Sequence, residues 1–203
     1  MNVPYVVPED EVTPYPADFD RVVDAVREMG YALDVIEKGR AAGAIFDDVP
    51  FLVSFDTAGR FLSIRALWES ELPAESAEPA LFATADNWNR EKYFPTVYWM
   101  SDPSGSLQVC ADFAVDTSAG LSDQQLTDHL GAGISTGIDA IRYMQEAATQ
   151  TLGWVAPEAT PYSASPEASA PAESFAQPQP GSPASTDTEA EERSAHSGAA
   201  FGL

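Results

Sequence analysis

Apolar residues recur every three or four positions along the stretch TPYPADFDRVVDAVREMG, a spacing that predicts an amphipathic helix near the N-terminus. Its apolar face consists of Phe19, Val22, Val23, Val26 and Met29. Asp18 is suited to cap the start of this helix, and Gly30 to provide its left-handed end. Residues 1–15 before it are acidic, contain Pro4 and Pro8 in their first twelve positions and are expected to be loosely ordered.

Four strand-like runs follow, at residues 31–37, 43–49, 50–56 and 60–68. Pro50 predicts a bend or a sheet edge between the second run and the third. The segment DTAGR predicts a tight hairpin in which Gly59 adopts a positive φ. In the fourth run Ser63 and Arg65 alternate with apolar residues, which is typical of a sheet with one buried face. The apolar set is Leu62, Ile64, Ala66 and Trp68.

A second helix is predicted from Pro79 to Tyr93, because proline suits the first helical position and Pro95 must end the helix at or before Phe94. Its apolar side consists of Leu81, Phe82, Ala85 and Trp88. Two further strands, at residues 96–101 and 106–116, are joined by the turn sequence DPSG. The last of these strands again alternates between an apolar and a mixed face.

The third helix has the clearest predicted start, where Ser122 and Gln125 match a capping box. Its interior contains Gly131, Gly133 and Gly137, each of which costs about 1 kcal/mol of helix propensity. We expect close approach to a sheet or to another chain to compensate this cost. Together these elements predict an α+β fold, an antiparallel sheet with helices packed on one face, in the order α-β-β-β-β-α-β-β-α.

The stretch NWNREKYFPTVYW, the strand LQVCADFAV and the helix entry GLSDQQL resemble the YbjN family of bacterial proteins. The matching positions are Asn87, Asn89, Pro95, Gly120, Leu121 and Ser122. The resemblance covers about residues 19–148. It implies a fold like that of type III secretion chaperones and a role as a sensory or regulatory accessory, and it supplies no catalytic residues.

Charge and composition restrict the partners. The formal net charge of −22 disfavours binding to nucleic acid and to anionic membranes, because phosphate binding depends on Lys and Arg. Cys110 is the one cysteine, which excludes an internal disulfide and a Cys-rich metal site. The N-terminus does not match a signal peptide, and no apolar run approaches the roughly 20 residues of a membrane span. We therefore expect a soluble, cytoplasmic protein.

The composition changes towards the C-terminus. We expect residues 16–154 to form the YbjN-like domain and residues 155–203 to form a disordered acidic tail, rich in Pro, Ala, Ser and Glu. The tail contains one basic residue, Arg193, and too few large apolar residues to offset the entropy of ordering. It is interpreted as a solubilising extension, with partner binding as the alternative.

The sequence contains no pattern that predicts a cofactor, metal or catalytic site. The pairs Asp18/Asp20 and Asp47/Asp48 could bind a hard cation, but they are better explained by a helix cap and a turn. His129 is expected at the boundary of the third helix, and His196 lies in the tail. Asp112 lies two residues after Cys110, and its carboxylate disfavours a thiolate, so a structural cysteine is the better interpretation.

Most of NWNREKYFPT is interpreted as a folding device. Trp88 is expected in the core, and the amides of Asn87 and Asn89 are expected to satisfy open backbone groups near the helix end. Tyr98 and Trp99 alternate, so one of the two rings should point outward. The outward ring and the mixed sheet face form a candidate partner-binding surface of Arg65, Tyr98, Trp99, Gln108 and Asp112, in which Arg65 pairs with Asp112 if their strands are neighbours.

These features predict a non-catalytic accessory that binds another protein, chaperone-like or sensory and regulatory, and that forms a homodimer. A small-ligand sensor that uses the outward aromatic ring is one alternative. An enzyme that acts through clustered carboxylates is the other.

Overall fold

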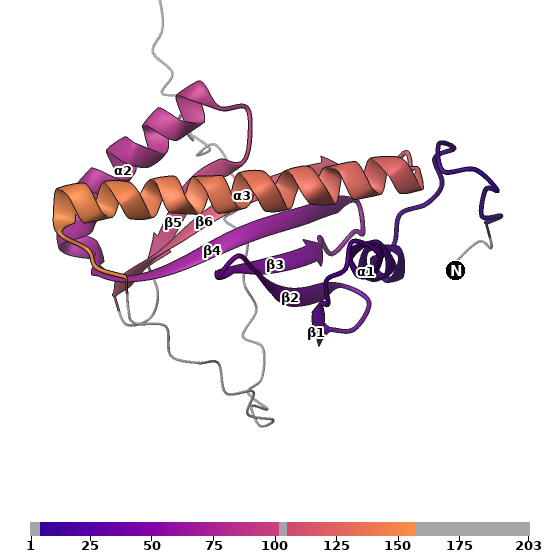
Figure 1. The fold of residues 1–203 in the computed structure, drawn as a ribbon, viewed down its shortest axis with the longest axis horizontal. Coiled ribbons are helices and arrows are strands. Elements are labelled where there is room, and N and C mark those ends of the chain that lie inside the picture. Colours follow the sequence, from indigo (N-terminus) through magenta and orange to yellow (C-terminus); the bar gives the residue numbers. More distant parts are fainter. Residues whose placement is uncertain (1–4, 102–104, 157–203) are drawn as a thin grey trace, which may run out of the picture. The chain divides into compact units, whose positions relative to one another are not determined.

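The computed structural model describes residues 5–101 and 105–156 (Figure 1). The chain divides into two units, Met1–Glu158 and Ala159–Leu203, and the described residues all belong to the first. The predicted tail beyond residue 156, with His196, therefore lies outside them, as do residues 102–104 of the predicted DPSG turn. The elements in chain order are α1 (Phe19–Glu28), β1 (Asp34–Glu37), β2 (Ala41–Phe46), β3 (Val49–Phe55), β4 (Phe61–Pro73), α2 (Ala74–Glu91), β5 (Thr96–Ser101), β6 (Ser106–Asp116) and α3 (Asp123–Leu152).

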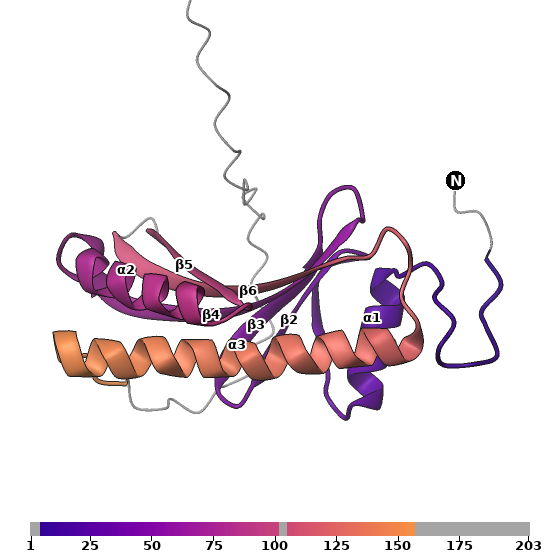
Figure 2. The ribbon, with the colours of Figure 1, turned by 90° about the horizontal axis from the view of Figure 1, so that it is seen from above.

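The strands form one six-stranded antiparallel sheet over the described residues, in the order β1-β2-β3-β4-β6-β5. The long helix α3 lies along one face of this sheet, and α2 packs beside it over β5 (Figure 2). The predicted α+β class and the predicted order of elements are confirmed. Within the described residues, no helix combines the length and the apolar character that a membrane span requires.

The glycines of α3 bring the helix close to the sheet of its own chain. A Cβ at Gly133 would lie 2.8 Å from Cδ1 of Ile64, and a Cβ at Gly137 would lie 2.9 Å from the ring of Phe51. At Gly131, by contrast, a Cβ would have no atom of another described element within 4 Å. Of the two expected explanations, close approach to the sheet therefore applies at Gly133 and Gly137.

The hairpin between β2 and β3 differs from its prediction. Asp47 and Asp48 form a two-residue turn with φ values of 49° and 65°, the positive values that a tight hairpin of this length favours. Pro50 is not a bend but a residue within β3, opposite Ile45. Pairing of β3 with β4 begins only at Phe51, so the N–H that Pro50 lacks removes no bond from that ladder.

Helix α2 begins earlier than predicted. It starts at Ala74, directly after β4, and Pro79 lies inside the helix instead of at its first position. Phe82 was expected on the buried side but is exposed, and its ring packs edge-on against Trp99 at 5.5 Å. The long strand β4 continues to Pro73 and leads straight into the helix, a continuity that the proline pattern did not reveal.

The N-terminal segment contacts the start of α3. Tyr15 pairs through its backbone with Leu121, and the guanidinium of Arg21 lies 3.3 Å from the centre of the Tyr15 ring. Arg21 also donates to the backbone carbonyls of Tyr15 and Leu121 and pairs with Asp123 at 2.8 Å. The Asp18 cap of α1 and the Ser122–Gln125 capping box of α3 are both present as predicted.

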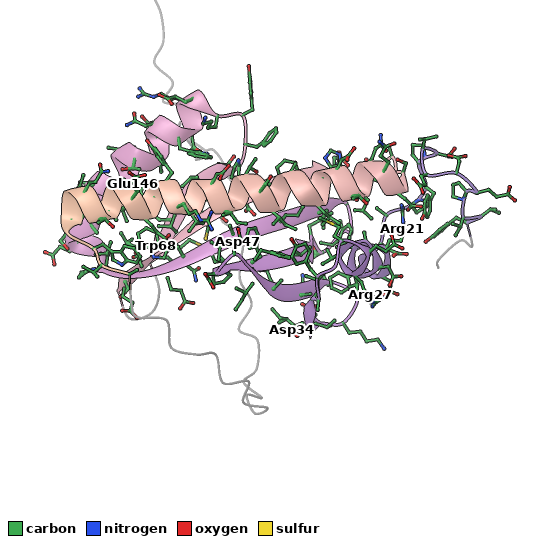
Figure 3. The ribbon with its side chains drawn as sticks, viewed as in Figure 1. Arg21, Arg27, Asp34, Asp47, Trp68 and Glu146 are labelled. Carbon is green, nitrogen blue, oxygen red and sulfur yellow. The ribbon has the colours of Figure 1, made fainter. Side chains whose placement is uncertain are left out.

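The end of α3 is anchored by two tryptophans. The side chain of Trp68 lies beneath the C-terminal half of α3 (Figure 3), and the ring of Trp154 packs edge-on against it at 4.9 Å. The indole N–H of Trp154 donates to the carbonyl of Ser70 at 3.1 Å. Trp154 is therefore a structural part of the domain.

Candidate functional site

The stretch NWNREKYFPT joins the end of α2 to the start of the edge strand β5. The Asn89 amide donates to the carbonyl of Val97 and accepts from its N–H, both at 2.8 Å. Trp88 is buried, and its indole N–H donates to the carbonyl of Pro95 at 3.0 Å. The expectation that these amides satisfy open backbone groups holds for Asn89, but the groups belong to β5 and not to the helix end. Asn87 instead accepts from Arg90.

On the face of the sheet away from the helices, four side chains form what we call the Asp112 cluster: Ser63, Arg65, Tyr98 and Asp112. The Asp112 carboxylate accepts from the Ser63 hydroxyl at 2.7 Å, from Arg65 at 2.7 and 3.1 Å and from the Tyr98 hydroxyl at 3.0 Å. Arg65 stands directly opposite Asp112 in the register of β4 and β6. The predicted pairing of these two residues is thus present.

Burial dominates the electrostatics of this cluster. It raises the pKa of Tyr98 far above its ordinary value, and the charge of Asp112 adds to the effect. Burial also raises the pKa of the neighbouring Cys110 thiol to about 11. Burial alone would lower the pKa of Arg65, but the hydrogen bond and charge of Asp112 outweigh it, so this pKa lies above its usual value. At neutral pH the site therefore holds a protonated phenol, a protonated thiol and a charged arginine.

β5 pairs with only part of the length of β6. Thr96 pairs with Asp112, and the pairing with β5 stops there, although β6 continues to Asp116. The Asn89 side chain binds the N–H and C=O of Val97, so these two groups point away from β6. Because hydrogen-bonded pairs alternate along an antiparallel ladder, the next pair, Thr96 and Asp112, exchanges backbone hydrogen bonds. Because backbone direction alternates along a strand, the N–H and C=O groups of Ala114 and Asp116 point the same way as those of Asp112. Within the part of the chain that the structure describes, no strand pairs with these two residues on that side.

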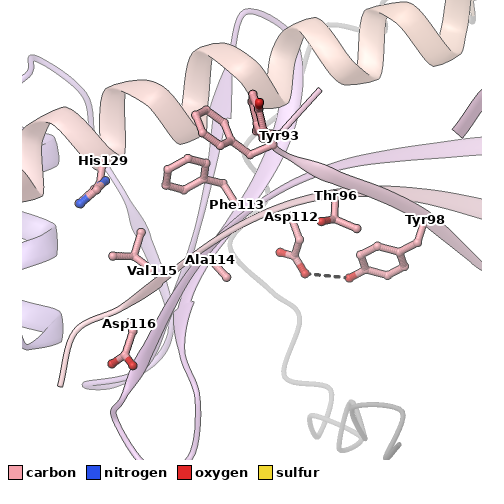
Figure 4. A pocket seen from close by; sticks show the side chains of 10 residues that line it. Tyr93, Thr96, Tyr98, Asp112, Phe113, Ala114, Val115, Asp116 and His129 are labelled. Carbon is pink, nitrogen blue, oxygen red and sulfur yellow. Dashed lines mark hydrogen bonds between the residues drawn. The ribbon is translucent and has the colours of Figure 1, made fainter. Parts of the chain in front are cut away.

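A groove of about 650 Å³ lies along this open edge (Figure 4). We call it the β6 edge groove; it is lined by Tyr93, Phe94, Thr96, Tyr98, the stretch Asp112–Asp116 and His129. Phe94 packs edge-on against Phe113 at 5.0 Å, and His129 on α3 lies 6.1 Å from the same ring. The Tyr93 side chain is fully exposed. The groove thus combines open backbone groups with aromatic rings, and it shares Tyr98 and Asp112 with the Asp112 cluster.

The sequence pattern of the family described as "YbjN: Putative bacterial sensory transduction regulator" matches residues 18–146. The chain belongs to the YbjN family. Among solved structures, YbjN from E. coli is similar at 13% identity with a TM-score of 0.52, over 68% of this chain and 96% of that one. A chain of the HopA1–SchA chaperone–effector complex is similar at 19% identity, with a TM-score of 0.40 over 68% and 98%. The Yersinia pestis type III secretion chaperone SycH, solved with a fragment of YscM2, is similar at 10% identity, with a TM-score of 0.36 over 60% and 97%. No curated protein sequence matches the chain.

The candidate surface predicted for this YbjN domain is divided between two faces of the sheet. Arg65, Tyr98 and Asp112 come together, and Gln108 lies on the same face, opposite Glu69 and Met100. Trp99 lies on the other face, where it packs against the core and Phe82. Tyr98 is therefore the outward ring.

The β6 edge groove of the YbjN domain was not predicted from the sequence. Phe94, Phe113 and His129 come from three separate segments, and their meeting depends on tertiary packing. One signal was present, because the predicted strand at 96–101 is much shorter than the one at 106–116 and Pro95 prevents its extension. Two adjacent strands of unequal length leave part of the longer one unpaired.

The candidate cation ligands of the YbjN domain do not assemble into a site within the described residues, where no group of three His, Cys, Asp or Glu side chains is placed to hold a metal ion. Asp18 caps α1, while Asp47 and Asp48 form the β2–β3 turn. Asp47 pairs with Arg142 at 3.5 Å. His129 is half-buried beside Phe113, which is the boundary position expected of it.

Proposed function

We propose that this chain is a non-catalytic, protein-binding accessory with a chaperone-like or sensory and regulatory role. The observation that carries the proposal is the β6 edge groove, where Ala114 and Asp116 present backbone groups beside the rings of Phe94 and Phe113. Aromatic rings beside open hydrogen-bonding groups are typical of protein recognition sites. The outward face of Arg65, Tyr98, Gln108 and Asp112 extends the proposed surface.

The state of the ionisable groups favours binding over catalysis. A general base needs a free acceptor, but the Asp112 carboxylate already accepts from three side chains. A nucleophilic cysteine needs a low pKa, whereas burial raises the pKa of Cys110 to about 11. An enzyme built on these carboxylates is therefore the weaker alternative.

A small-ligand sensor is the other alternative, because the groove volume of about 650 Å³ falls within the range of small-molecule sites. The unpaired strand edge favours a polypeptide instead, since a polypeptide can satisfy N–H and C=O groups in alternation. The charge of −22 further favours a protein partner over nucleic acid or an anionic membrane.

The test is site-specific photo-crosslinking in the native cell. A photoreactive phenylalanine analogue replaces Tyr93 at the groove or, as the control, Tyr31, a half-exposed tyrosine that packs on Phe46 at the far end of the sheet. We expect one protein to be labelled from position 93 and not from position 31. The purified partner should then bind the domain, with at least about tenfold weaker affinity for Phe94→Ala. Equal labelling from both positions, or no binding between the purified proteins, would contradict the proposal.

A homodimer is the second candidate, favoured by the exposed edge strand β1 with its exposed apolar residues Val35 and Ile36. Two copies of β1 paired about a twofold axis would set Asp34 opposite Glu37 of the other copy, and these like charges oppose the pairing. If a dimer forms through β1, salt should strengthen it by screening this repulsion. Light scattering at low and moderate salt tests this, and a monomer mass over the whole concentration range excludes it.

A further inference from the structure

The β6 edge groove has the geometry of an incomplete strand pair. β5 pairs with β6 from Leu107 to Asp112. Because the chain turns away at Pro95, β5 does not extend along the rest of β6. Thr117 donates its N–H to the carbonyl of Arg60 on the opposite side, which fixes the alternation along the end of β6. Ala114 and Asp116 consequently direct their N–H and C=O groups into the groove, and Ala114 is exposed.

Resting on the proposed function, we propose that the partner contributes an extended segment that adds to the sheet beside Ala114–Asp116, antiparallel to β6 and in line with β5. An antiparallel orientation continues the pattern of the sheet, in which neighbouring strands are antiparallel. The added strand forms backbone hydrogen bonds with Ala114 and Asp116 of the same kind as those that β5 forms with Asp112. The site is thus a short docking edge for one segment of a partner protein.

The two faces of the groove define which side chains the segment carries. Residues of the added strand that lie opposite Phe113 and Val115 face the helix side, where they meet the rings of Phe94, Phe113 and His129. Residues opposite Ala114 face the outer side, next to Tyr98 and Asp116. Because strand side chains alternate, the segment carries apolar residues at every second position. The backbone N–H groups of these apolar residues point away from β6.

The net charge of the chain indicates which side chains suit the remaining positions. The chain has a formal net charge of −22, and an acidic segment would approach against this field. A basic segment is attracted instead, and basic side chains opposite Ala114 remain at the solvent-exposed face. The proposed occupant is therefore an extended segment that alternates apolar and basic residues.

The probe is a short peptide of alternating valine and lysine, and its affinity for the full chain is measured by fluorescence anisotropy. Methylation of the lysine backbone nitrogens blocks the N–H groups directed at β6, and methylation of the valine nitrogens blocks those directed away. We expect the first change to weaken binding by about tenfold or more and the second to leave the affinity within about twofold. Equal affinity of the two methylated peptides, or the reverse order, overturns the proposed antiparallel strand.

A matched pair of variants tests the same bonds from the side of the domain. Ala114→Pro removes the N–H that points into the groove, a change that an edge position tolerates, and Ala114→Ser retains it. We expect the proline variant to bind the peptide at least about fivefold more weakly than the serine variant. On addition of peptide to the unaltered chain, hydrogen exchange of the Ala114 amide should slow. If Ala114→Pro fails to fold, the methylated peptides and the exchange rate still decide.

Failure of this proposal is distinguishable from failure of the proposed function. If a partner is labelled from position 93 and binds the purified domain while the Ala114 amide exchanges unchanged in the complex, the domain binds protein in another way and strand addition is wrong. If no protein is labelled and no alternating peptide binds, both proposals are wrong.

Discussion

Replacing each of the three interior glycines of α3 by alanine should separate the cost of a helical glycine from the need for close packing. Gly131→Ala adds a methyl group into open space, whereas Gly133→Ala and Gly137→Ala add one against the sheet. The three changes are chemically identical and lie within two turns of one helix. They therefore differ only in what the new methyl group meets.

The expected magnitudes follow from the contacts. Gly131→Ala gains the helix propensity of alanine, about 1 kcal/mol in the free energy of unfolding. At Gly133 the new Cβ would lie 3.1 Å from Cβ of Ile64, an atom attached directly to the backbone of β4 that cannot rotate away. At Gly137 the Cβ would lie 3.1 Å from Cβ of Ala66 as well as against the Phe51 ring. Overpacking of this kind costs about 1–3 kcal/mol, so both changes should lower stability by about 1 kcal/mol net.

Equilibrium unfolding in urea, followed by tryptophan fluorescence and circular dichroism, measures the three free energies. The free energy of unfolding of Gly131→Ala should exceed that of each of the other two variants by about 2 kcal/mol. If Gly133→Ala and Gly137→Ala stabilise the protein as much as Gly131→Ala does, the helix does not lie as close to the sheet as the distances indicate, and the explanation of these glycines is wrong.

Three further predictions concern the core and the end of the domain. Because burial raises the pKa of Cys110 to about 11, its thiol in the folded protein should react with a disulfide reagent at pH 8 at least about 100-fold more slowly than in urea; similar rates would contradict its burial. The raised pKa of Tyr98 keeps its phenol protonated in the folded state, whereas the phenol of the unfolded state ionises above about pH 10. The free energy of unfolding, measured by urea titration, should therefore fall as the pH rises past 10. Tyr98→Phe should make this fall shallower. Truncation after Trp154 should leave the unfolding temperature nearly unchanged. Truncation after Leu152 should lower the free energy of unfolding by about 2 kcal/mol, because the Trp154 ring and its hydrogen bond to Ser70 are lost. Equal stability of the two truncated proteins would refute the anchoring role of Trp154.

Much of the fold was predictable because its signals are local. The alternation at Leu62–Trp68, the capping box at Ser122 and the cap at Asp18 each depend on neighbouring residues, and each is present in the structure. The errors arose where local preference competes with tertiary structure. Pro79 is a good first helical residue, yet α2 already begins at Ala74 because β4 leads directly into it.

The site was predictable only in part, for the same physical reason. Opposite charges on alternating positions predicted the pair of Arg65 and Asp112, since strand pairing brings such residues together. The β6 edge groove depends on where a strand stops and on which helix residues lie nearby. His129 reaches Phe113 only through the packing of α3 on the sheet, and periodicity along the chain contains no information about that distance.

The stretch NWNREKYFPT connects folding to the proposed function. Trp88 and Asn89 bind the backbone of Pro95 and Val97, so the end of α2 determines where β5 begins. Because β5 begins there, β6 continues past it, and within the described residues Ala114 pairs with β4 on one side and with no strand on the β5 side. The residues that end the helix and start the strand therefore also create the open edge. A folding interpretation and a binding interpretation of this stretch do not compete, since the docking edge is a consequence of the way the chain turns.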